Sequence, residues 1–487
     1  MRRGGSKRGE EVAGRIPGSV RNDLHLALGS VDRMMRRGRE SRSNNMVELL
    51  GKSREELRAF CVALGEPAYR GGQIYHALYA ERKFEFARMT NLPMALRERL
   101  GKDAQITLPD VKQRFVSSDG SVRYLLGLKG TEENKFNTAG IEEGSTQDTG
   151  ENQRRSGRTQ VPASVEAVYM PSEGRQTICI STQAGCAVDC HFCLTAQLGL
   201  IRNLTAGEIV SQVLVPLGEQ GTRNEGKVAG LEAGHESGSK IASGAKDPVV
   251  ATPRRPGRRL QPSKDRVDAQ TRSLAATQAH GAIQTNVVLM GQGEPLLNFE
   301  PVMAALGIML DPEGMGLSPK HVTLSTSGIV PGIERLAQEK ARPKLAISLN
   351  ASSDEERDAL MPINKKYPLK ILLQACQNYP LRPWEHLTFE YVMLGEVNDS
   401  PDDARRIVKL LAGLPRVKVN LIPWNPGELP YRESPPERVE EFRRILTDKG
   451  IPAFVRYSRG RDVMAACGQL ALKEVHSSPL TVLSRNL

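Results

Sequence analysis

The chain has 487 residues and a mass of 53.4 kDa, enough for one large domain or for two to three domains. It has no apolar run of about 18 residues, and its mean hydropathy is −0.39, so the sequence excludes a membrane-spanning protein. The net charge of +11 comes from residues 1–45, with +6, and residues 221–280, with +5. Charge therefore indicates an RNA partner only weakly.

The seven cysteines are an odd number, and three of them fall within eight residues. This pattern favours a metal site in a reducing compartment over a disulfide framework. Residues 1–19 contain several arginines but no apolar segment of a secretory signal. Acidic residues such as Glu10 and Glu11 argue against an organelle transit peptide. We therefore expect a cytoplasmic protein.

The first part of the chain predicts a flexible basic extension followed by a small helical domain. Residues 1–45 lack periodicity, whereas residues 46–108 contain short amphipathic segments and are predicted to form a helical accessory domain. The predicted helices are Glu55–Leu64, Gly71–Glu81 and Pro93–Leu100. Val111–Ser117 and Ser121–Leu128 then predict a β-hairpin with an Asp-Gly turn.

Two polar segments interrupt the remainder of the chain. Residues 131–160 are nearly free of aromatic residues, and residues 221–280 contain no Phe, Trp or Tyr. Neither segment can bury enough apolar surface to offset the entropy of ordering it. We expect both to be disordered inserts in a core that spans residues 109–475, followed by a tail at residues 476–487.

Outside these inserts, strand-like and helix-like segments alternate. The expected strands are Gln176–Thr182, Asn286–Met290, His321–Thr326, Lys344–Leu349, Leu387–Leu394, Val417–Pro423 and Ala453–Tyr457. The expected helices are Ala206–Leu217, Phe299–Leu310, Gly332–Glu339, Leu369–Tyr379, Asp402–Leu411 and Pro436–Thr447. Two of them begin with capping boxes, Thr205 with Glu208 and Ser434 with Glu437. Six such units predict an α/β fold with a parallel sheet that approaches a barrel.

Three cysteines follow the first strand of this alternation, in the spacing Cys-x3-Cys-x2-Cys. Cys186, Cys190 and Cys193 can converge on one small object, and thiolates suit either zinc or an iron–sulfur cluster. A structural zinc site needs a fourth ligand, which His191 could supply. Three cysteines on a cubane cluster instead leave one iron free to bind a substrate or cofactor.

This spacing at the end of a first barrel strand resembles the signature of the radical S-adenosylmethionine (SAM) superfamily. That resemblance implies a glycine-rich segment after the second strand for the methionine end of SAM. Gly291–Pro295 is in this position. Its glycines permit close backbone approach, and its Glu294 carboxylate can pair with an ammonium group.

Seven collinear segments resemble a narrower family, RlmN, which comprises dual-specificity adenine-C2 methyltransferases of 23S ribosomal RNA and transfer RNA. The segments are Ser181–Cys186, Met290–Asn298, Thr323–Gly328, Ala346–Asn350, Met361–Lys366, Leu421–Pro426 and Arg459–Leu470. The resemblance covers residues 46–130 and 161–472, and it implies a radical SAM partial (β/α)6 barrel with a small N-terminal helical accessory domain.

The resemblance also implies a role for each matching residue. Cys186, Cys190 and Cys193 would hold a [4Fe-4S] cluster. SAM would be bound by Gly293, Glu294, Ser325, Ser348, Leu349, Asn350 and Asn425. The residues from Ser325 onward lie at or just after the carboxyl ends of predicted strands. Barrel enzymes place their catalytic groups at these strand ends. Taken singly, each Ser or Asn could equally be a turn or a cap.

Adenine C2 is electron-poor and cannot attack the methyl group of SAM as a nucleophile, so a radical route is needed. The family resemblance implies that one SAM methylates Cys467 and a second SAM yields a 5′-deoxyadenosyl radical that activates this methyl group. Glu166 would accept the C2 proton, and Cys179 would close a transient disulfide with Cys467 to release the RNA. The alternatives are an exposed strand carboxylate for Glu166 and a buried small hydrophobe for Cys179. We expect Cys61 and Cys376 to be core residues.

The implied partners are 23S ribosomal RNA, transfer RNA and a flavodoxin-type electron donor, and we expect a monomer that does not bind membranes. In the accessory domain, the basic side chains of Arg54, Arg58, Arg70, Arg82 and Lys83 could contact phosphates or form a solvated helix face. Two alternatives stay open: a C8-specific enzyme like the Cfr methyltransferases, and a non-catalytic iron–sulfur or zinc RNA-binding regulator.

Overall fold

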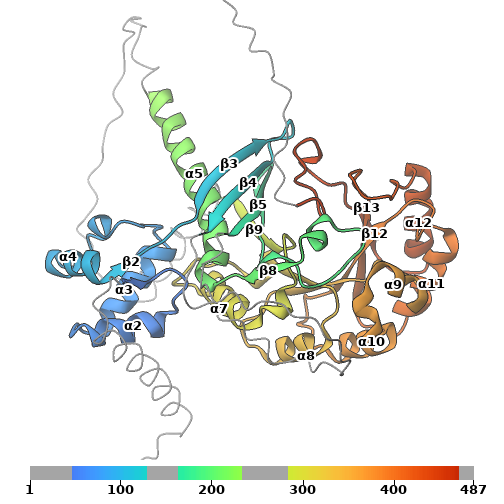
Figure 1. The fold of residues 1–487 in the computed structure, drawn as a ribbon, viewed down its shortest axis with the longest axis horizontal. Coiled ribbons are helices and arrows are strands. Elements are labelled where there is room, and N and C mark those ends of the chain that lie inside the picture. The colour runs from blue at the N-terminus through green and yellow to red at the C-terminus, as the bar shows by residue number, and fades with distance from the viewer. Residues whose placement is uncertain (1–45, 129–162, 233–282, 471–487) are drawn as a thin grey trace, which may run out of the picture. The chain divides into compact units, whose positions relative to one another are not determined.

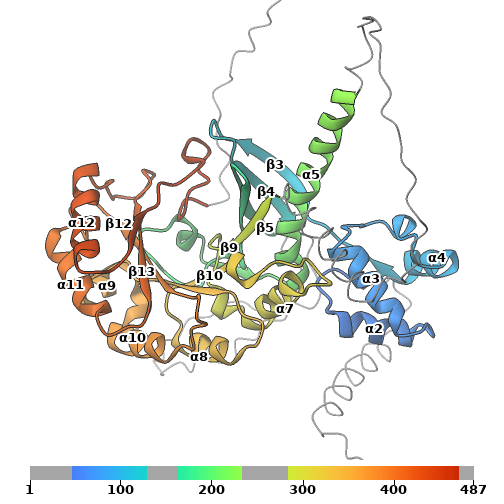
Figure 2. The same ribbon diagram turned by 180° about the vertical axis from the view of Figure 1, so that it is seen from behind.

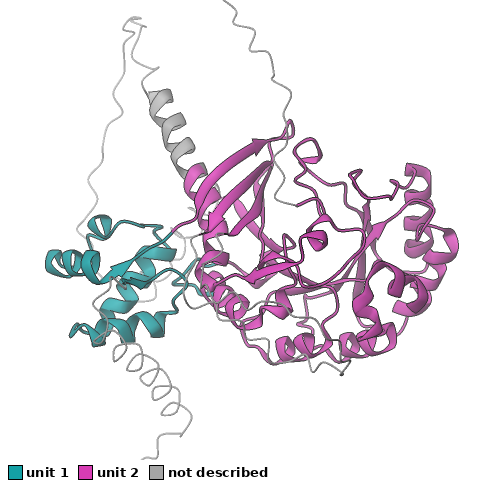
Figure 3. Ribbon diagram, viewed as in Figure 1, with its two compact units in different colours: residues 1–107, 311–316 teal, residues 108–310, 317–487 magenta. Residues whose placement is uncertain are grey.

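The computed structural model describes residues 46–128, 163–232 and 283–470. The chain divides into two compact units, one formed by residues 1–107 with 311–316 and the other by residues 108–310 with 317–487 (Figure 3). The predictions for residues 1–45, 131–160, 476–487 and most of 221–280 lie outside the described residues.

The first unit is a small helical module. Its helices are α2 (Arg54–Ala63), α3 (Tyr69–Tyr79), the 3-10 helix η1 (Phe86–Arg88) and α4 (Met94–Asp103), and the strands β1 (Val47–Glu48) and β2 (Ala104–Gln105) pair in parallel. A capping box between Ser53 and Glu56 begins α2. A Cβ at Gly71 would lie 2.3 Å from the backbone nitrogen of Arg58, so only glycine permits this approach of α3 to α2. The predicted helices are confirmed.

The second unit contains a ten-stranded sheet in the order β14-β13-β12-β11-β10-β9-β6-β5-β4-β3. One end of the sheet is antiparallel and consists of β3 (Asp110–Val116), β4 (Val122–Leu128), β5 (Ala163–Ser172) and β6 (Arg175–Cys179). The predicted hairpin is the β3–β4 pair, and the amide of Gly120 at its turn bonds the carbonyl oxygen of Ser117.

From β6 onward the sheet is parallel. Its further strands are β9 (Gln284–Leu289), β10 (Val322–Thr326), β11 (Lys344–Ser348), β12 (Leu387–Met393), β13 (Val417–Pro423) and β14 (Ala453–Val455). The connecting helices are α5 (Ala206–Glu232), α7 (Phe299–Leu310), α8 (Val330–Gln338), α9 (Asp354–Leu360), α10 (Leu369–Asn378), α11 (Pro401–Leu411) and α12 (Pro436–Asp448). Helices α7 to α12 lie along the outside of the curved sheet in both views (Figures 1 and 2). The predicted α/β barrel-like fold is confirmed.

The two faces of the parallel strands differ in polarity because successive side chains point to opposite sides of the sheet. On β12, Tyr391 packs its ring 5.2 Å from that of Phe442 on α12. The neighbouring Glu390 accepts a hydrogen bond from Asn420 of β13 at 2.8 Å. The helix-facing side is therefore apolar, and the inner side carries polar groups.

Several short elements were not predicted. Strands β7 (Gln183–Gly185) and β8 (Leu200–Asn203) form a separate antiparallel pair. Helix α9 has seven residues, mostly charged, so it carries too little periodicity to be recognised in sequence. The 3-10 helices η2 to η6 are Leu194–Leu198, Pro295–Leu297, Pro319–His321, Pro362–Lys365 and Arg461–Val463.

The predicted start of one insert and one predicted capping box were wrong. Helix α5 continues through residues 221–232, where we expected the insert to begin. Helix α12 has Pro435 as its N-cap, and the buried Ser434 hydroxyl has no hydrogen-bond partner in the described part of the chain. The two prolines that follow Ser434 move the helix start one residue along, so its side chain does not cap the first turn. The Thr205–Glu208 capping box is confirmed.

No helix within the described ranges has both the length and the apolar character needed to cross a bilayer.

Candidate functional site

The three clustered cysteines lie in the loop that joins β7 to β8. The amide of Cys186 donates to the carbonyl oxygen of Gly199 at 3.0 Å and closes the base of the loop. Gly185 has φ +74°, and a Cβ there would lie 1.9 Å from the same oxygen. The glycine before the first cysteine is therefore required for the two ends of the loop to meet.

The cysteine loop is anchored by an apolar cluster. Cys190 and Cys193 pack against a buried cluster that contains Phe192, Met361 and Trp424. The amide of His191 donates to the carbonyl oxygen of Leu360 at the end of α9, at 3.0 Å. The loop thus rests on the helix that follows β11.

The three thiols share one environment. The pKa of Cys186 is raised to about 12, mainly by burial and then by the nearby Glu294 and Cys193. Burial also raises the pKa of Cys190 well above its usual value, with further contributions from Cys193 and Cys186. Cys186 and Cys190, with their raised pKa values, become thiolates readily only when a cationic metal centre compensates their charge.

The donor set fits a cluster better than a single ion. Within the described ranges, no three side chains among His, Cys, Asp and Glu have the geometry to hold one metal ion. The His191 side chain is largely exposed, and its Nε2 lies 3.7 Å from Asp189, so it does not complete a tetrahedral zinc site with the thiols. In a cubane cluster each thiolate binds a different iron, so three cysteines without a fourth protein ligand fit it.

The glycine-rich segment after β9 runs beside the strand end that precedes the cysteine loop. Gly293 has φ +99°, and a Cβ there would lie 2.7 Å from the backbone nitrogen of Gln183. Glu294 is buried, and its carboxylate accepts hydrogen bonds from the amides of Ser327, at 2.7 Å, and Leu296, at 3.1 Å. Burial raises the pKa of Glu294, and these bonds oppose that shift. Each carboxylate oxygen retains a further lone pair for a ligand.

Ser325 and Ser348 end neighbouring strands, β10 and β11, and their hydroxyl oxygens are 3.4 Å apart. Behind them lies the fully buried guanidinium of Arg357 from α9. It donates to the carbonyl oxygens of Ser327 at 2.6 Å, Leu349 at 3.1 Å and Ser348 at 3.2 Å. One side chain thus fixes the carboxyl ends of both strands.

Arg357 remains charged in this position. Burial lowers its pKa to about 10, while the thiol of Cys190 and two aspartates raise it. In the described residues it forms no ion pair within 4 Å, because its nitrogens bond the three carbonyls and Asn364. The guanidinium therefore places a positive charge near the cysteine loop.

Asn350 adopts the left-handed conformation, with φ +57°, directly after β11. Its side-chain oxygen accepts from the amide of Val392, and its own carbonyl accepts from Asn398 at 2.8 Å. Asn398 is fully buried and also donates to the carbonyl oxygen of Val392. It thereby ties the ends of β11 and β12 together and holds Asn350 in a strained conformation.

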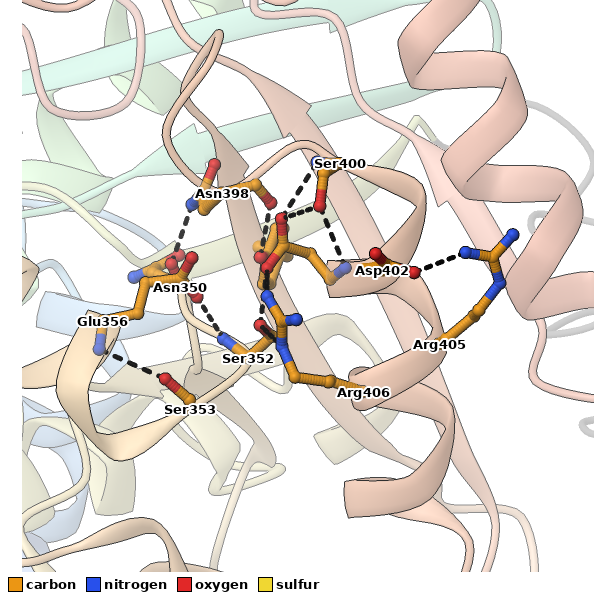
Figure 4. Close-up of polar contacts among 11 residues, drawn as sticks. Asn350, Ser352, Ser353, Glu356, Asn398, Ser400, Asp402, Arg405 and Arg406 are labelled. Atoms are coloured by element: carbon orange, nitrogen blue, oxygen red, sulfur yellow. Dashed lines mark hydrogen bonds and ion pairs between the residues drawn. The ribbon is translucent and has the colours of Figure 1, made fainter.

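A polar network continues from Asn350 towards α11 (Figure 4). The Ser352 amide donates to Glu356 at 2.5 Å, and the Ser352 hydroxyl donates to Asp403 at 2.6 Å. Arg406 donates from Nε to the same hydroxyl at 2.7 Å and also pairs with Asp403. The loop after β11 is thus fastened to the first turn of α11.

Asn425, Cys467 and Gly468 line a pocket together with Phe192 and Leu194 of the cysteine-loop region. Asn425 donates to the hydroxyl of Ser458 at 2.8 Å, and the Leu194 amide donates to the carbonyl oxygen of Gly468 at 2.9 Å. The Cys467 side chain is accessible to solvent although protein surrounds it on most sides. This recessed position accounts for a pKa raised to about 11, mainly by burial and then by Glu390 and Cys193.

Cys179 is a further thiol that packs against the segment carrying Cys467. It is buried in an apolar cluster with Val168, Ala465 and Leu470, two of which belong to the segment that carries Cys467. Burial raises the pKa of Cys179, and the charge of Cys467 raises it further. Both cysteines are free thiols in the structure. Cys179 is therefore packed as a buried small residue. It also lies beside the segment that carries Cys467.

Glu166 is fully buried on β5, so the alternative of an exposed strand carboxylate is wrong. It forms an ion pair with the equally buried Arg123 of β4. The side-chain amide of Gln292, from the glycine-rich segment, donates to the other carboxylate oxygen at 3.3 Å. This carboxylate therefore lies beside the predicted SAM-binding segment, paired with a guanidinium on one oxygen and an amide on the other.

Sequence reasoning missed Arg123, Arg357 and Asn398. Each is a fully or almost fully buried polar residue. Their sequence signal is weak, because isolated Arg and Asn residues in a polar segment are usually exposed. Arg357 alone had a usable signal, since it stands between two matched segments, Ala346–Asn350 and Met361–Lys366.

In the first unit the predicted phosphate-binding side chains have varied surroundings. Arg54 pairs with Glu313 at 2.6 Å, and Lys83 pairs with Glu81 at 2.9 Å. Arg70 donates to Gln73 and lies 4.8 Å from the ring of Tyr69, which is 55% exposed. Arg58 and Arg82 form no ion pair among the described residues.

Comparisons with known proteins agree with this arrangement. Residues 47–106 match the ribosomal RNA large subunit methyltransferase N-terminal domain, and residues 255–411 match the radical SAM superfamily. A probable dual-specificity RNA methyltransferase RlmN from Koribacter versatilis is 42% identical over 85% of this chain and 98% of its own length. A dual-specificity RNA methyltransferase RlmN from Anaeromyxobacter dehalogenans is 37% identical over 87% of this chain and 91% of its own length.

The fold also has a solved relative. The crystal structure of a radical SAM methyltransferase from Sphaerobacter thermophilus matches 87% of this chain and 99% of its own, with a TM-score of 0.64 and 34% identity.

Proposed function

This chain belongs to the RlmN family of radical SAM RNA methyltransferases, and on that basis we propose that it methylates C2 of adenine in 23S ribosomal RNA and transfer RNA. The observation that carries the proposal is the recess around Cys467. An accessible thiol there adjoins the three-cysteine loop on one side and Cys179 on the other.

The residues of this site fit two cofactors. Cys186, Cys190 and Cys193 would hold a [4Fe-4S] cluster, with the charge of Arg357 favouring the thiolate of Cys190. SAM would be bound at the strand ends by Gly293, Glu294, Ser325, Ser348, Leu349, Asn350 and Asn425. When bound, the two cofactors supply the methyl group and the radical that activates it.

Cys467 would carry the methyl group. Its thiol is exposed to the recess, so both the methyl donor and the RNA base can reach it. After the methyl carbon has bonded to C2 of adenine, Cys467 is linked to the RNA. The Cys179 thiol gives up its proton, and its sulfur then attacks the Cys467 sulfur, so that an S–S bond forms and the S–C bond breaks. The electron pair of the broken bond takes up a proton at the methylene carbon, which leaves on the RNA as its methyl group.

Glu166 would accept the proton that C2 loses before this release. The carboxylate is positioned by Arg123, which pairs with one oxygen, and by Gln292, which donates to the other. A fully buried base also acts only on a group that has entered the site, which suits a flipped-out nucleotide.

We propose a flavodoxin-type reductant as electron donor, the cytoplasm as the compartment and a monomer as the working form. The target adenine must leave its stack to reach a recessed thiol, so single-stranded loops in both RNAs are the expected substrates.

The proposal is tested by anaerobic methylation of ribosomal and transfer RNA fragments with SAM and a reductant, followed by mass spectrometry of the nucleosides. The expected product is 2-methyladenosine. The Cys467→Ala variant should lose the product and keep its iron and sulfide content. If 8-methyladenosine alone appeared, the enzyme would have C8 specificity, and the assignment to C2 would be wrong.

A further inference from the structure

The last strand of the sheet carries two exposed aromatic side chains close to the proposed site. Among the strands of the described ranges, β14 pairs with β13 alone and forms the edge of the sheet. Phe454 on this strand is 51% exposed, and Tyr457 just beyond it is 63% exposed. Edge strands with exposed apolar side chains invite unwanted pairing, so such side chains are retained most readily where a partner covers them.

Cations accompany these aromatic rings. Arg456 lies between them in sequence, is exposed and donates to Asn420 at 3.3 Å. Lys418 on the neighbouring β13 is half-buried, and Arg456 lowers its pKa in addition to the effect of burial. The nearby carboxylate, Glu390, is buried and bonded to Asn420. Among the described residues neither Arg456 nor Lys418 is in an ion pair, so this edge carries excess positive charge.

This edge is continuous with the recess around Cys467. Ser458, the residue after Tyr457, accepts the hydrogen bond of Asn425 that lines the recess. The chain then runs through residues 459–466 directly to Cys467. An RNA that places one base at Cys467 would therefore have the adjacent nucleotides near strand β14.

We propose that a surface that we term the β14 edge binds the single-stranded RNA that flanks the target adenine. It consists of Phe454, Arg456, Tyr457 and Lys418. The inference rests on the proposed function and extends it from the reacting base to the adjacent nucleotides. The aromatic rings stack on bases, which need no particular sequence because every base has a π-face. The two cations bind the phosphates between those bases. This surface would keep the loop open while the adenine lies in the recess.

The test uses the full-length protein and a short RNA hairpin whose loop carries the target adenine next to 2-aminopurine. Binding is measured by fluorescence anisotropy at several salt concentrations, and stacking by quenching of the 2-aminopurine. Tyr457→Ala and Phe454→Ala should each weaken binding about tenfold, and at least one should abolish the quenching. Tyr457→Phe should retain both. Arg456→Ala should reduce the salt slope by about 1.

Two matched controls lie on the outer helices. Ile371, which is 49% exposed on α10, and Arg405, whose side chain is 60% exposed on α11, should be replaceable by alanine without change in RNA binding. Wild-type affinity and quenching in both aromatic-to-alanine variants would overturn the inference and leave the proposed function intact. A wild-type protein that bound neither RNA fragment would overturn the proposed function as well. Loss of self-association with unchanged RNA binding would identify the edge as a contact between copies of this chain, which also contradicts the inference.

Discussion

The guanidinium of Arg357 donates to the carbonyl oxygen of Ser327 at 2.6 Å and to that of Leu349 at 3.1 Å, and thereby joins the ends of β10 and β11. These strand ends carry Ser325, Ser348 and Asn350 of the proposed SAM site. The side chain that connects them is fully buried and belongs to a helix that none of the sequence patterns indicated.

Arg357→Met should therefore destabilise the barrel and weaken SAM binding. It leaves buried carbonyl oxygens without a donor, and each such group costs roughly 1–3 kcal/mol. Isothermal titration of SAM should show at least a tenfold higher Kd, and the thermal midpoint should fall. Arg357→Lys should recover only part of the SAM affinity and of the thermal stability, because an ammonium cannot span three carbonyls. Arg405→Met on the exposed face of α11 is the control. An unchanged Kd in Arg357→Met would contradict the positioning role.

The Arg123–Glu166 pair predicts a non-additive result. Arg123→Met leaves the Glu166 carboxylate buried without its cation, which costs about 3–5 kcal/mol of unfolding free energy. The double variant Arg123→Met/Glu166→Gln removes both charges and should be more stable than the single variant. Thermal denaturation of the three proteins tests this order. A double variant less stable than Arg123→Met would show that the pair is not the main interaction of Glu166.

Gly293→Ala should disrupt the glycine-rich segment. The residue has φ +99°, and the new Cβ would lie 2.6 Å from the Cβ of Gln183. We expect a stability loss of roughly 1–3 kcal/mol and a loss of SAM binding. Gly307→Ala is the matched control, because this helical glycine on α7 has no atom within 4 Å of the added Cβ. It should be stabilising by about 0.5–1 kcal/mol. Equal effects of the two substitutions on SAM binding would refute the prediction.

Glu356 should make stability depend on pH near neutrality. Burial raises its pKa to about 7, and the nearby Asp403 raises it further, whereas the Ser352 amide and Arg406 oppose the shift. The folded state then binds the Glu356 proton more tightly than the unfolded state does. The contribution of Glu356 to stability is therefore greatest below about pH 4.5 and falls as pH rises through 7. Glu356→Gln should abolish this dependence and stabilise the protein at pH 8 by on the order of 2 kcal/mol. Thermal melts from pH 5 to 8 measure it, and parallel profiles for both proteins would contradict it.

Cys179→Ala should trap the RNA on the protein if Cys179 releases it. The expected species is a covalent protein–RNA adduct that survives denaturing electrophoresis after anaerobic turnover. Cys376→Ala provides the matched control, since Cys376 is an equally buried cysteine on α10 that lies outside the site. It should turn over without an adduct. Release of methylated RNA by Cys179→Ala at the wild-type rate would remove Cys179 from the proposed mechanism.

The sequence by itself determined the elements whose signal is local. Strand β13 and helix α7 have the predicted bounds, because periodic apolar residues and flanking turn residues report on backbone conformation over a few positions. The spacing of Cys186, Cys190 and Cys193 is equally local, so the three thiols could be recognised as one site before any fold was known.

Only the tertiary structure decided which distant polar groups meet. Cys179 lies beside the Cys467 segment, Arg123 neutralises Glu166, and Arg357 joins two strand ends. The family resemblance had implied the pairing of Cys179 with Cys467, but the two arginine contacts are not visible in sequence, because an isolated Arg or Glu has the same local pattern whether it is exposed or buried. The parallel sheet brings its strand ends to one edge, and the energetic demand that buried charges and donors be satisfied then selects the partners.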